Sequence, residues 1–303
     1  MIKRIIDVSN PSYLHTRNYQ MIVEQERNEV ERVPIEDMGV LILSHPAITI
    51  SSSLISSCQQ NNCIIVFCDS KHLPVSVLLP LSGNSIHSKV LNIQTSVKKP
   101  TKKRLWQKIV IAKIESQTKA LLSCGKNPSA LELMKSRVKS GDPDNVESQA
   151  SRVYWPLMFG KDFRRDQKAE GTNSLLNYGY ALLRASVARA ICGTGLHPAL
   201  GVHHHNQYNP MCLADDLMEP FRPVVDRRVY RLWEKEIFDI SKKTKSFLLS
   251  FLAEPLIFRG KKLPFMVALQ HTATSLKKAL TEGPESLEIP NLVTKGQQEM
   301  FLI

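Results

Sequence analysis

The sequence lacks three features that would place the protein in a membrane or outside the cell. No apolar run reaches the ~18 residues that a membrane-spanning helix needs. The six cysteines form no Cys-x-x-Cys pair, so we expect free thiols in a reducing compartment, with no disulfide and no zinc knuckle. Residues 1–7 are too few, and turn acidic too soon, for a secretory signal. We therefore expect a cytoplasmic protein with no membrane partner.

Acidic residues are scarce relative to basic ones. Asp and Glu number 28 against 40 for Lys and Arg, which gives a net charge of +12 and a pI near 9.4. This excess favours a polyanionic partner, either nucleic acid or an anionic surface. The alternative is a basic protein with no such partner. The length of 303 residues allows about two domains, each with its own core.

The hydrophobic pattern changes between residues 83 and 97. Before this segment, short and mostly β-branched apolar runs at 2–8, 19–23, 40–43, 47–50, 64–67 and 73–80 predict strands, with a serine-capped helix at 51–59. We expect a mostly antiparallel, sandwich-like β domain over residues 1–82. Residues 83–97 are polar and weakly patterned, which indicates a linker or a hairpin.

From residue 98 onward the apolar residues follow a helical period. A stripe through Leu105, Ile109 and Ala112 predicts a helix with Thr101 as its N-cap. Further helices are expected near 129–140, 143–155, 172–191, 211–219, 225–252 and 266–281, and the tail after residue 282 shows little periodicity. The fold class is therefore α+β with two domains: a β-rich N-terminal domain (1–82), a linker (83–97) and an all-α domain (98–303).

Basic residues gather in four clusters, within 98–108, 161–168, 242–245 and 259–262. Cations beside aromatic side chains suit a phosphate backbone, because each cation that meets a phosphate releases condensed counterions. Any single cluster is more simply explained as a solvated helix face, but four on one chain favour a nucleic-acid partner. The DNA-binding residues that we predict are Lys98, Lys99, Lys102, Lys103, Arg104, Lys161, Arg164, Arg165, Lys242, Lys243 and Lys245.

A run of three histidines, residues 203–205, precedes an acidic predicted helix. Asp215, Asp216 and Glu219 stand at spacings of three and four residues, which place them on one helical face. Such carboxylates repel each other unless a metal ion or Arg222 balances them. Carboxylates with one imidazole bind Mg²⁺ or Mn²⁺ and leave positions open for water and phosphate oxygens. The alternative is an ordinary histidine-rich turn followed by an acidic surface helix.

A further acid, Glu147, lies near the start of the helix that Asp142-Pro143 predicts, with Asp142 as N-cap and Pro143 as the first helical residue. Its carboxylate could serve a metal site. The alternative is that Glu147 only favours the positive end of this helix.

These residues lie within motifs that resemble those of the CRISPR adaptation integrases, the first-numbered CRISPR-associated proteins (Cas one), in the branch found with type II systems. The order and separations of the motifs fit residues 140–230, and the domain plan fits essentially the whole chain. The matching stretches are Glu147 with R-V-Y-W at 152–155, F-G at 159–160 with F-R-R at 163–165, L-N-Y-G-Y-A-L-L at 176–183, G-L-H-P at 195–198 with G-V-H-H at 201–204, and L-A-D-D-L-M-E-P-F-R-P at 213–223 followed by Asp226.

The resemblance implies a set of metal ligands and near-site residues. The family ligands map onto Glu147, His204 and Glu219, with His204 chosen by the spacing Gly-x-x-His from Gly201. The histidine run leaves this choice open by one residue, so His203 and His205 are near-site residues. Asp216 is expected to position a basic residue rather than to bind the metal.

The resemblance also implies partners and a reaction. We expect a homodimer formed through the β-rich domain, and a heterohexamer in which two dimers flank a small ferredoxin-like partner (Cas two). The expected activity is a Mg²⁺- or Mn²⁺-dependent DNA integrase and endonuclease. It inserts short double-stranded fragments into the CRISPR array by attack of a 3′ hydroxyl on a phosphodiester.

Two alternatives to this function stay open. One is a DNA-binding scaffold of the same family that has lost its chemistry. The other is an unrelated histidine–carboxylate metallohydrolase that acts on small substrates. Such an enzyme would not need four basic clusters, and its activity would resist salt, whereas DNA affinity falls steeply with salt.

Overall fold

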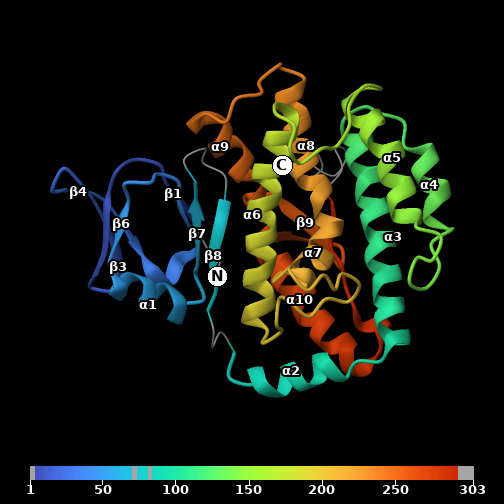
Figure 1. Ribbon diagram of the computed structural model, residues 1–303, viewed down its shortest axis with the longest axis horizontal. Coiled ribbons are helices and arrows are strands. Elements are labelled where there is room, and N and C mark those ends of the chain that lie inside the picture. Colours follow the sequence, from blue (N-terminus) through green and yellow to red (C-terminus); the bar gives the residue numbers. More distant parts are fainter. Residues whose placement is uncertain (1–3, 70–73, 81–83, 293–303) are drawn as a thin grey trace.

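The N-terminal part consists of two four-stranded sheets. The computed structural model describes residues 4–69, 74–80 and 84–292. Figure 1 shows the sheets at one side of the molecule and the helices at the other. The first sheet has the order β1 (Arg4–Val8), β5 (Met38–Leu43), β7 (Ile64–Cys68) and β8 (Pro74–Leu78), and the second has the order β4 (Asn28–Pro34), β3 (Gln20–Gln25), β2 (Tyr13–Arg17) and β6 (Thr49–Ile50).

The strand pairing corrects one expectation about this part. β1 with β5, β5 with β7 and β2 with β6 pair in parallel, whereas the other strand pairs of these two sheets are antiparallel. The mostly antiparallel sheet expected from the sequence is therefore wrong. The polar strands β2 and β4 carry too few apolar residues to be predicted, and they separate β1 from its partner β5 along the chain. The short helix is confirmed: α1 (Ser52–Gln60) is capped by Ser51, whose hydroxyl accepts from Leu54 N at 3.3 Å.

The sandwich-like arrangement is confirmed by the core between the sheets. Leu14 and Met21 of the second sheet meet Leu41 and Ile65 of the first, together with Leu54 of α1, and all five side chains are fully buried. Side chains of a strand alternate between its two faces. Val40, Ile42, Ile64 and Val66 therefore point to the opposite face of the first sheet, where they join the core of the helical part.

Residues expected to form a linker or hairpin instead form a helix, α2 (His87–Ser96). It runs beneath the molecule in Figure 1 and leads into α3 (Lys99–Ser123), one of the long helices. The buried Gln94 of α2 donates to the carbonyl oxygens of His197 and Leu200, at 2.9 and 2.8 Å. These bonds tie α2 to a distant loop. Residues 81–83 lie outside the described residues, and the division of the chain at residue 82 stays a prediction.

The helical region follows the predicted order with changes at several boundaries. The helix expected at 225–252 is wrong, because the chain breaks after Trp233 and Glu236 adopts a φ of +54°. The helix expected at 129–140 ends early, at Lys135. The further helices are α4 (Ser129–Lys135), α5 (Val146–Phe159), α6 (Thr172–Gly193), α7 (Cys212–Met218), α8 (Arg222–Trp233), α9 (Lys242–Leu249) and α10 (Phe265–Glu282), with short 3-10 helices at Ile35–Asp37 (η1), Glu219–Phe221 (η2), Ser250–Ala253 (η3) and Pro284–Ser286 (η4).

A small sheet within this region corrects the expectation of an all-α domain. Its order is β10 (Lys261–Pro264), β9 (Pro255–Phe258) and β11 (Asn291–Leu292). Arg259 and Gly260 both have positive φ, which is the backbone of a tight hairpin turn. β11 belongs to the tail, of which residues 293–303 lie outside the described part. Within the described residues, no helix is long and apolar enough to span a bilayer.

Candidate active site

Asp142 fixes the start of α5, the helix that carries Glu147. Its carboxylate accepts from the backbone N–H of Val146 at 2.8 Å and of Glu147 at 3.0 Å. The helix begins at Val146 and not at Pro143 as expected, because both Asp142 and Asn145 have positive φ. Asp142 is thus a cap that acts from four residues upstream. It holds the backbone of Glu147 directly.

Asp216 of α7 organises the histidine turn. Its fully buried carboxylate accepts from the backbone N–H of Val202, His203 and His204 at 2.6 to 3.1 Å, and it lies 2.6 Å from Nδ1 of His204. This hydrogen bond raises the pKa of His204. A Cβ on Gly201 would meet the carbonyl oxygen of His204 at 2.2 Å, so the turn needs glycine at this position.

Glu219 begins η2 directly after α7 and meets two cations. Its Oε1 lies 2.8 Å from Arg222 Nε, and its Oε2 lies 2.5 Å from Lys113 Nζ of α3. Burial raises the pKa of Glu219, but Arg222 and Lys113 together outweigh burial and lower it to about 2. Lys113 also contacts Glu147 Oε1. Burial lowers the pKa of Lys113, yet Glu219 and Glu147 raise it above its ordinary value.

The other two acids near Glu219, Asp215 and Asp226, have partners other than Arg222. Asp215 pairs with Arg184 at 2.6 Å. Asp226 accepts from the hydroxyls of Tyr154 and Tyr180. Arg222 pairs with Glu219 and so balances that carboxylate, which is one of the two alternatives that the sequence left open. The carboxylates of residues 215, 216 and 219 are close in the sequence, but each one pairs with a different basic group.

The three predicted metal ligands line one cavity of about 260 Å³. Glu147, His204 and Glu219 reach it from α5, the histidine turn and η2, and the wall is completed by Trp106, Asp142, Asn145 and His203. His203 stacks on Trp106, with ring centroids 4.1 Å apart and planes at 5°. His205 is exposed and turns its Nδ1 to the carbonyl oxygen of His203 at 2.8 Å.

The donor set in this cavity fits a divalent cation. Two carboxylates and one imidazole suit Mg²⁺ or Mn²⁺. Because Asp216 holds Nδ1 of His204, Nε2 is left as the ligand nitrogen, an arrangement common at metal sites. Among the described residues, apart from the Lys113 ammonium, Glu219 Oε2 has no partner. In the described part of the chain, no three His, Cys, Asp or Glu side chains already stand in a metal-binding arrangement.

Arginine side chains line the groove next to this cavity. Arg165 binds the side-chain oxygens of Asn173 at 2.9 Å and Asn177 at 2.6 Å. It lines a cavity of about 490 Å³ together with Arg184, Arg222 and the two site residues His204 and Glu219. The predicted cation Arg165 thus lies beside the candidate metal ligands.

Among the other predicted DNA-binding residues, those at the start of α3 also lie near the site. Lys98, Lys99, Lys103 and Arg104 are exposed, and Lys102 Nζ lies 3.5 Å from the carbonyl oxygen of Gly201. Lys161 and Arg164 are exposed in the loop after α5. Lys242 and Lys243 are exposed on α9, at the far end of the molecule from the start of α3 in Figure 1.

Lys245 does not belong to a DNA-facing surface, which corrects the sequence-based assignment. Its side chain is 3% exposed, and burial lowers its pKa. It stands on the face of α9 that turns inward, toward Asp7 and Cys68. Lys242, Lys243 and Lys245 are all basic, so their sequence does not show which of them the helix turns toward the core.

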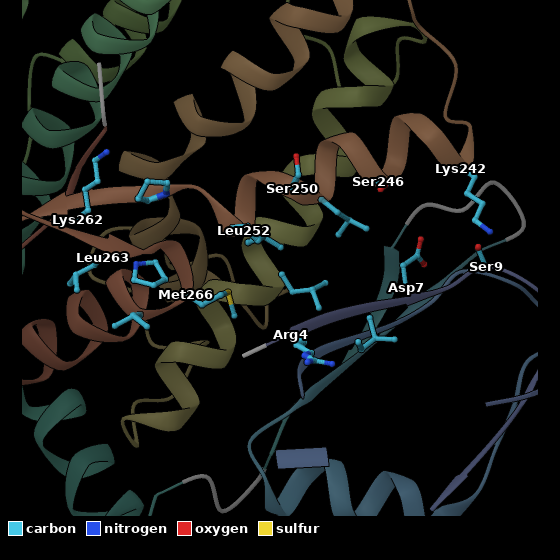
Figure 2. Close-up of a pocket in the computed structure, with 17 residues that line it drawn as sticks. Arg4, Asp7, Ser9, Lys242, Ser246, Ser250, Leu252, Lys262, Leu263 and Met266 are labelled. Atoms are coloured by element: carbon cyan, nitrogen blue, oxygen red, sulfur yellow. The ribbon is translucent and has the colours of Figure 1, made fainter. Parts of the chain in front are cut away.

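A larger cavity of about 870 Å³ lies away from these residues. Figure 2 shows Asp7 of β1 on one wall and Leu263 and Met266 on the other. Its lining is mainly apolar, and of the predicted site residues it contains only Lys242. Among the described residues that line it, Asp7 is the only carboxylate and there is no histidine, so it lacks the combination of carboxylates and imidazole that we expect at the metal site.

Two residues of the site were not identified from the sequence, Lys113 and Arg184. Lys113 stands among apolar residues on the buried side of a long helix, next to Ile114. A single cation on a buried helical face indicates a buried acidic partner, so this pattern could have identified Lys113 from the sequence. Arg184 follows the apolar stretch of α6 and gave no comparable signal.

Comparison with known proteins decides the family. The family model for CRISPR associated protein Cas1 matches residues 8–251. The chain belongs to the Cas1 family. It is 31% identical over 298 residues to the CRISPR-associated endonuclease Cas1 of Neisseria meningitidis serogroup C (strain 8013), and the match covers 97% of each chain. The sequence-based resemblance and the integrase and endonuclease class that it implied are therefore confirmed.

Solved structures show that the Cas1 fold extends over almost the whole chain. A casposase bound to integration product has a TM-score of 0.75 at 20% identity, covering 93% of this Cas1 chain and 91% of that chain. A Cas6-RT-Cas1–Cas2 complex has a TM-score of 0.77 at 16% identity, covering 96% of this chain and 36% of that one. At these identities the likeness concerns the fold.

Proposed function

We propose that Glu147, His204 and Glu219 hold a Mg²⁺ or Mn²⁺ ion with which this Cas1 protein joins a captured DNA fragment to the CRISPR array. The observation that carries the proposal is the convergence of these three side chains on one cavity. When bound, the ion activates the attacking 3′ hydroxyl and stabilises negative charge at the phosphorus centre. One phosphodiester replaces another, so the reaction needs no nucleotide cofactor.

The other residues of the site orient the proposed metal ligands and bind the DNA. Asp216 holds the imidazole of His204 in one orientation, and Asp142 fixes the backbone at Glu147. Arg165, Arg184 and Arg222 line the adjoining groove, where guanidinium groups suit the phosphates of a DNA strand. The exposed cations at the start of α3 extend this path. Positioning and charge stabilisation supply the rate acceleration.

The partners that we propose are double-stranded DNA, a second copy of the chain and a Cas2 protein. A relative in fold was solved with an integration product, and another within a complex with Cas2, which supports the first and third partners. We place the homodimer contact in the β-rich part, residues 1–82, and expect two dimers to flank a Cas2 dimer in a heterohexamer. The reaction would take place in the cytoplasm, where the array lies.

The test is an integration assay with the Cas2 subunit, a short DNA duplex and a supercoiled array. Glu147→Ala, His204→Ala and Glu219→Ala should each abolish strand joining, whereas DNA binding, which depends on the basic surfaces, should be largely retained. Normal integration by the Glu219 variant in Mn²⁺ would show that the ligand assignment is wrong. The same assay on the unaltered protein tests the scaffold alternative, which requires DNA binding without any metal-dependent joining.

The alternative of a metallohydrolase for small substrates makes a different prediction about salt. Binding of DNA through several phosphates should weaken by orders of magnitude between about 50 and 200 mM salt. Activity on a small substrate would change little over this range. A salt-resistant activity would therefore count against DNA as the substrate.

A further inference from the structure

Lys113 already occupies the position between two of the proposed metal ligands. Its side chain is 8% exposed, and its ammonium contacts Glu147 Oε1 and Glu219 Oε2. A buried ammonium is stable only beside opposite charge, and two buried carboxylates are stable only beside a cation. Lys113 therefore keeps these two acids together.

A divalent cation that binds the same two carboxylates cannot share their oxygens with the ammonium. Like charges at a separation of about 4 Å repel each other strongly at a partly buried site. Lys113 has the flexible four-carbon stem that would let its ammonium move away. The question is then which group would receive the ammonium.

The structure contains a suitable acceptor one helical turn further along α3. Gln117 follows Lys113 by four residues, so both side chains lie on one face of the helix. Gln117 is 2% exposed, and within the described residues its Oε1 is buried and has no hydrogen-bond partner. Both side chains line one cavity of about 230 Å³, whose wall also includes the carboxylate of Asp226. A buried acceptor without a donor is costly and calls for an explanation.

We propose that Lys113 is a positioning residue with two states: it holds Glu147 and Glu219 together before the metal binds, and it turns to Gln117 Oε1 when a divalent ion enters. The inference rests on the proposed metal site. It gives Gln117 Oε1, a buried acceptor without a partner among the described residues, a donor in the second state. It also gives a basis for selectivity, because Na⁺ or K⁺ offers the carboxylates no more charge than the ammonium does, whereas Mg²⁺ or Mn²⁺ offers twice as much.

The first test measures Mn²⁺ affinity of the full-length protein from the electron paramagnetic resonance signal of free Mn²⁺. Lys113→Met keeps the length of the side chain but removes its charge, so it should bind Mn²⁺ roughly tenfold more tightly or better. Without metal the variant should melt at a lower temperature, because Glu147 and Glu219 then repel each other. Lys119→Met is the matched control, since Lys119 pairs with Glu115 on the same helix outside the site. The control should leave Mn²⁺ affinity unchanged.

The second test is a double-mutant cycle with Gln117→Leu. This variant removes the acceptor, so it should weaken Mn²⁺ binding when Lys113 is present and have no effect in the Lys113→Met background. Unchanged or weaker Mn²⁺ affinity in Lys113→Met overturns the inference, as does an equal effect of Gln117→Leu in both backgrounds. The metal site itself is tested separately by Glu147→Ala and Glu219→Ala. If these bind Mn²⁺ as the unaltered protein does, the proposed function fails rather than the role of Lys113.

Discussion

Asp216 Oδ1 lies 2.6 Å from Nδ1 of His204, and the same carboxylate accepts three backbone N–H groups of the turn that carries this histidine. One buried acid thus fixes both the path of the chain and the orientation of the ring. Of the three adjacent histidines, His204 is the one held by a carboxylate. This relationship favours His204 as the metal ligand over His203 and His205.

Replacing Asp216 with asparagine should weaken the metal site through His204. The amide has only one oxygen that can accept hydrogen bonds and carries no charge, so the pKa of His204 should fall toward 6.5. Metal affinity should fall by about 10- to 100-fold. An NMR pH titration of the imidazole and a Mn²⁺ binding curve measure the two effects. Asp215→Asn is the control, since that neighbouring acid pairs with Arg184 and should shift the His204 pKa much less. An unchanged pKa in Asp216→Asn would contradict this account.

The basic residues at the start of α3 should contribute to DNA binding in proportion to the phosphates that they meet. Lys99→Ala, Lys103→Ala and Arg104→Ala should each weaken binding at low salt, and each should reduce the slope of log affinity against log salt by about one. Fluorescence anisotropy with a labelled duplex at several salt concentrations gives both quantities. Lys245→Met should leave the slope unchanged, because this lysine is buried. A reduced slope for Lys245→Met would return that residue to the DNA-binding set.

Asp226 should make the protein less stable as the pH rises from about 4 to 6. Burial raises its pKa from 3.8 to about 6, although Tyr180 and Tyr154 oppose the shift by hydrogen bonding. Over this window the folded protein holds a proton that the unfolded chain has released. Folding stability therefore falls with rising pH, by up to roughly 3 kcal/mol. Urea unfolding at pH 4.5, 5.5 and 7 measures the change.

Two variants separate the contribution of Asp226 from other titrating groups. Asp226→Asn cannot ionise, so the loss of stability between pH 4 and 6 should become smaller. Tyr154→Phe removes a hydrogen bond to the charged carboxylate, which should raise the pKa of Asp226 further and extend the loss to higher pH. An identical pH dependence in all three proteins would show that another group is responsible.

Asp142 should stabilise α5 and position Glu147 at once. Asp142→Ala removes two hydrogen bonds to backbone N–H groups of the first helical turn and should lower the free energy of unfolding by about 1 kcal/mol. It should also reduce integration, since the backbone at Glu147 is no longer held. Asp144→Ala is a suitable control, because Asp144 is exposed and pairs with Lys139. Equal stability of the two variants would exclude the capping role of Asp142.

Local signals in the sequence predicted much of the fold. The serine before α1, the apolar runs of β1, β5 and β7, and the helical period of α3, α6 and α10 are each contained in a few consecutive residues. Elements that depend on strand pairing or on where the chain turns were missed. β2 and β4 are polar strands that pair with β3, and the two-residue strand β11 pairs with β9. The helix expected at 225–252 is interrupted where the chain turns at Glu236.

For the site, the sequence by itself determined which residues have suitable chemistry. The motifs singled out Glu147, His204 and Glu219, because their types and spacing are visible without a fold. Only the tertiary structure decided which charged groups lie beside these three residues and how deeply each group is buried. It placed Lys113 of α3 between Glu147 and Glu219, turned Asp216 to His204, and buried Lys245. The physical reason is that charge pairing and desolvation depend on distance in space, which spacing along a chain does not contain.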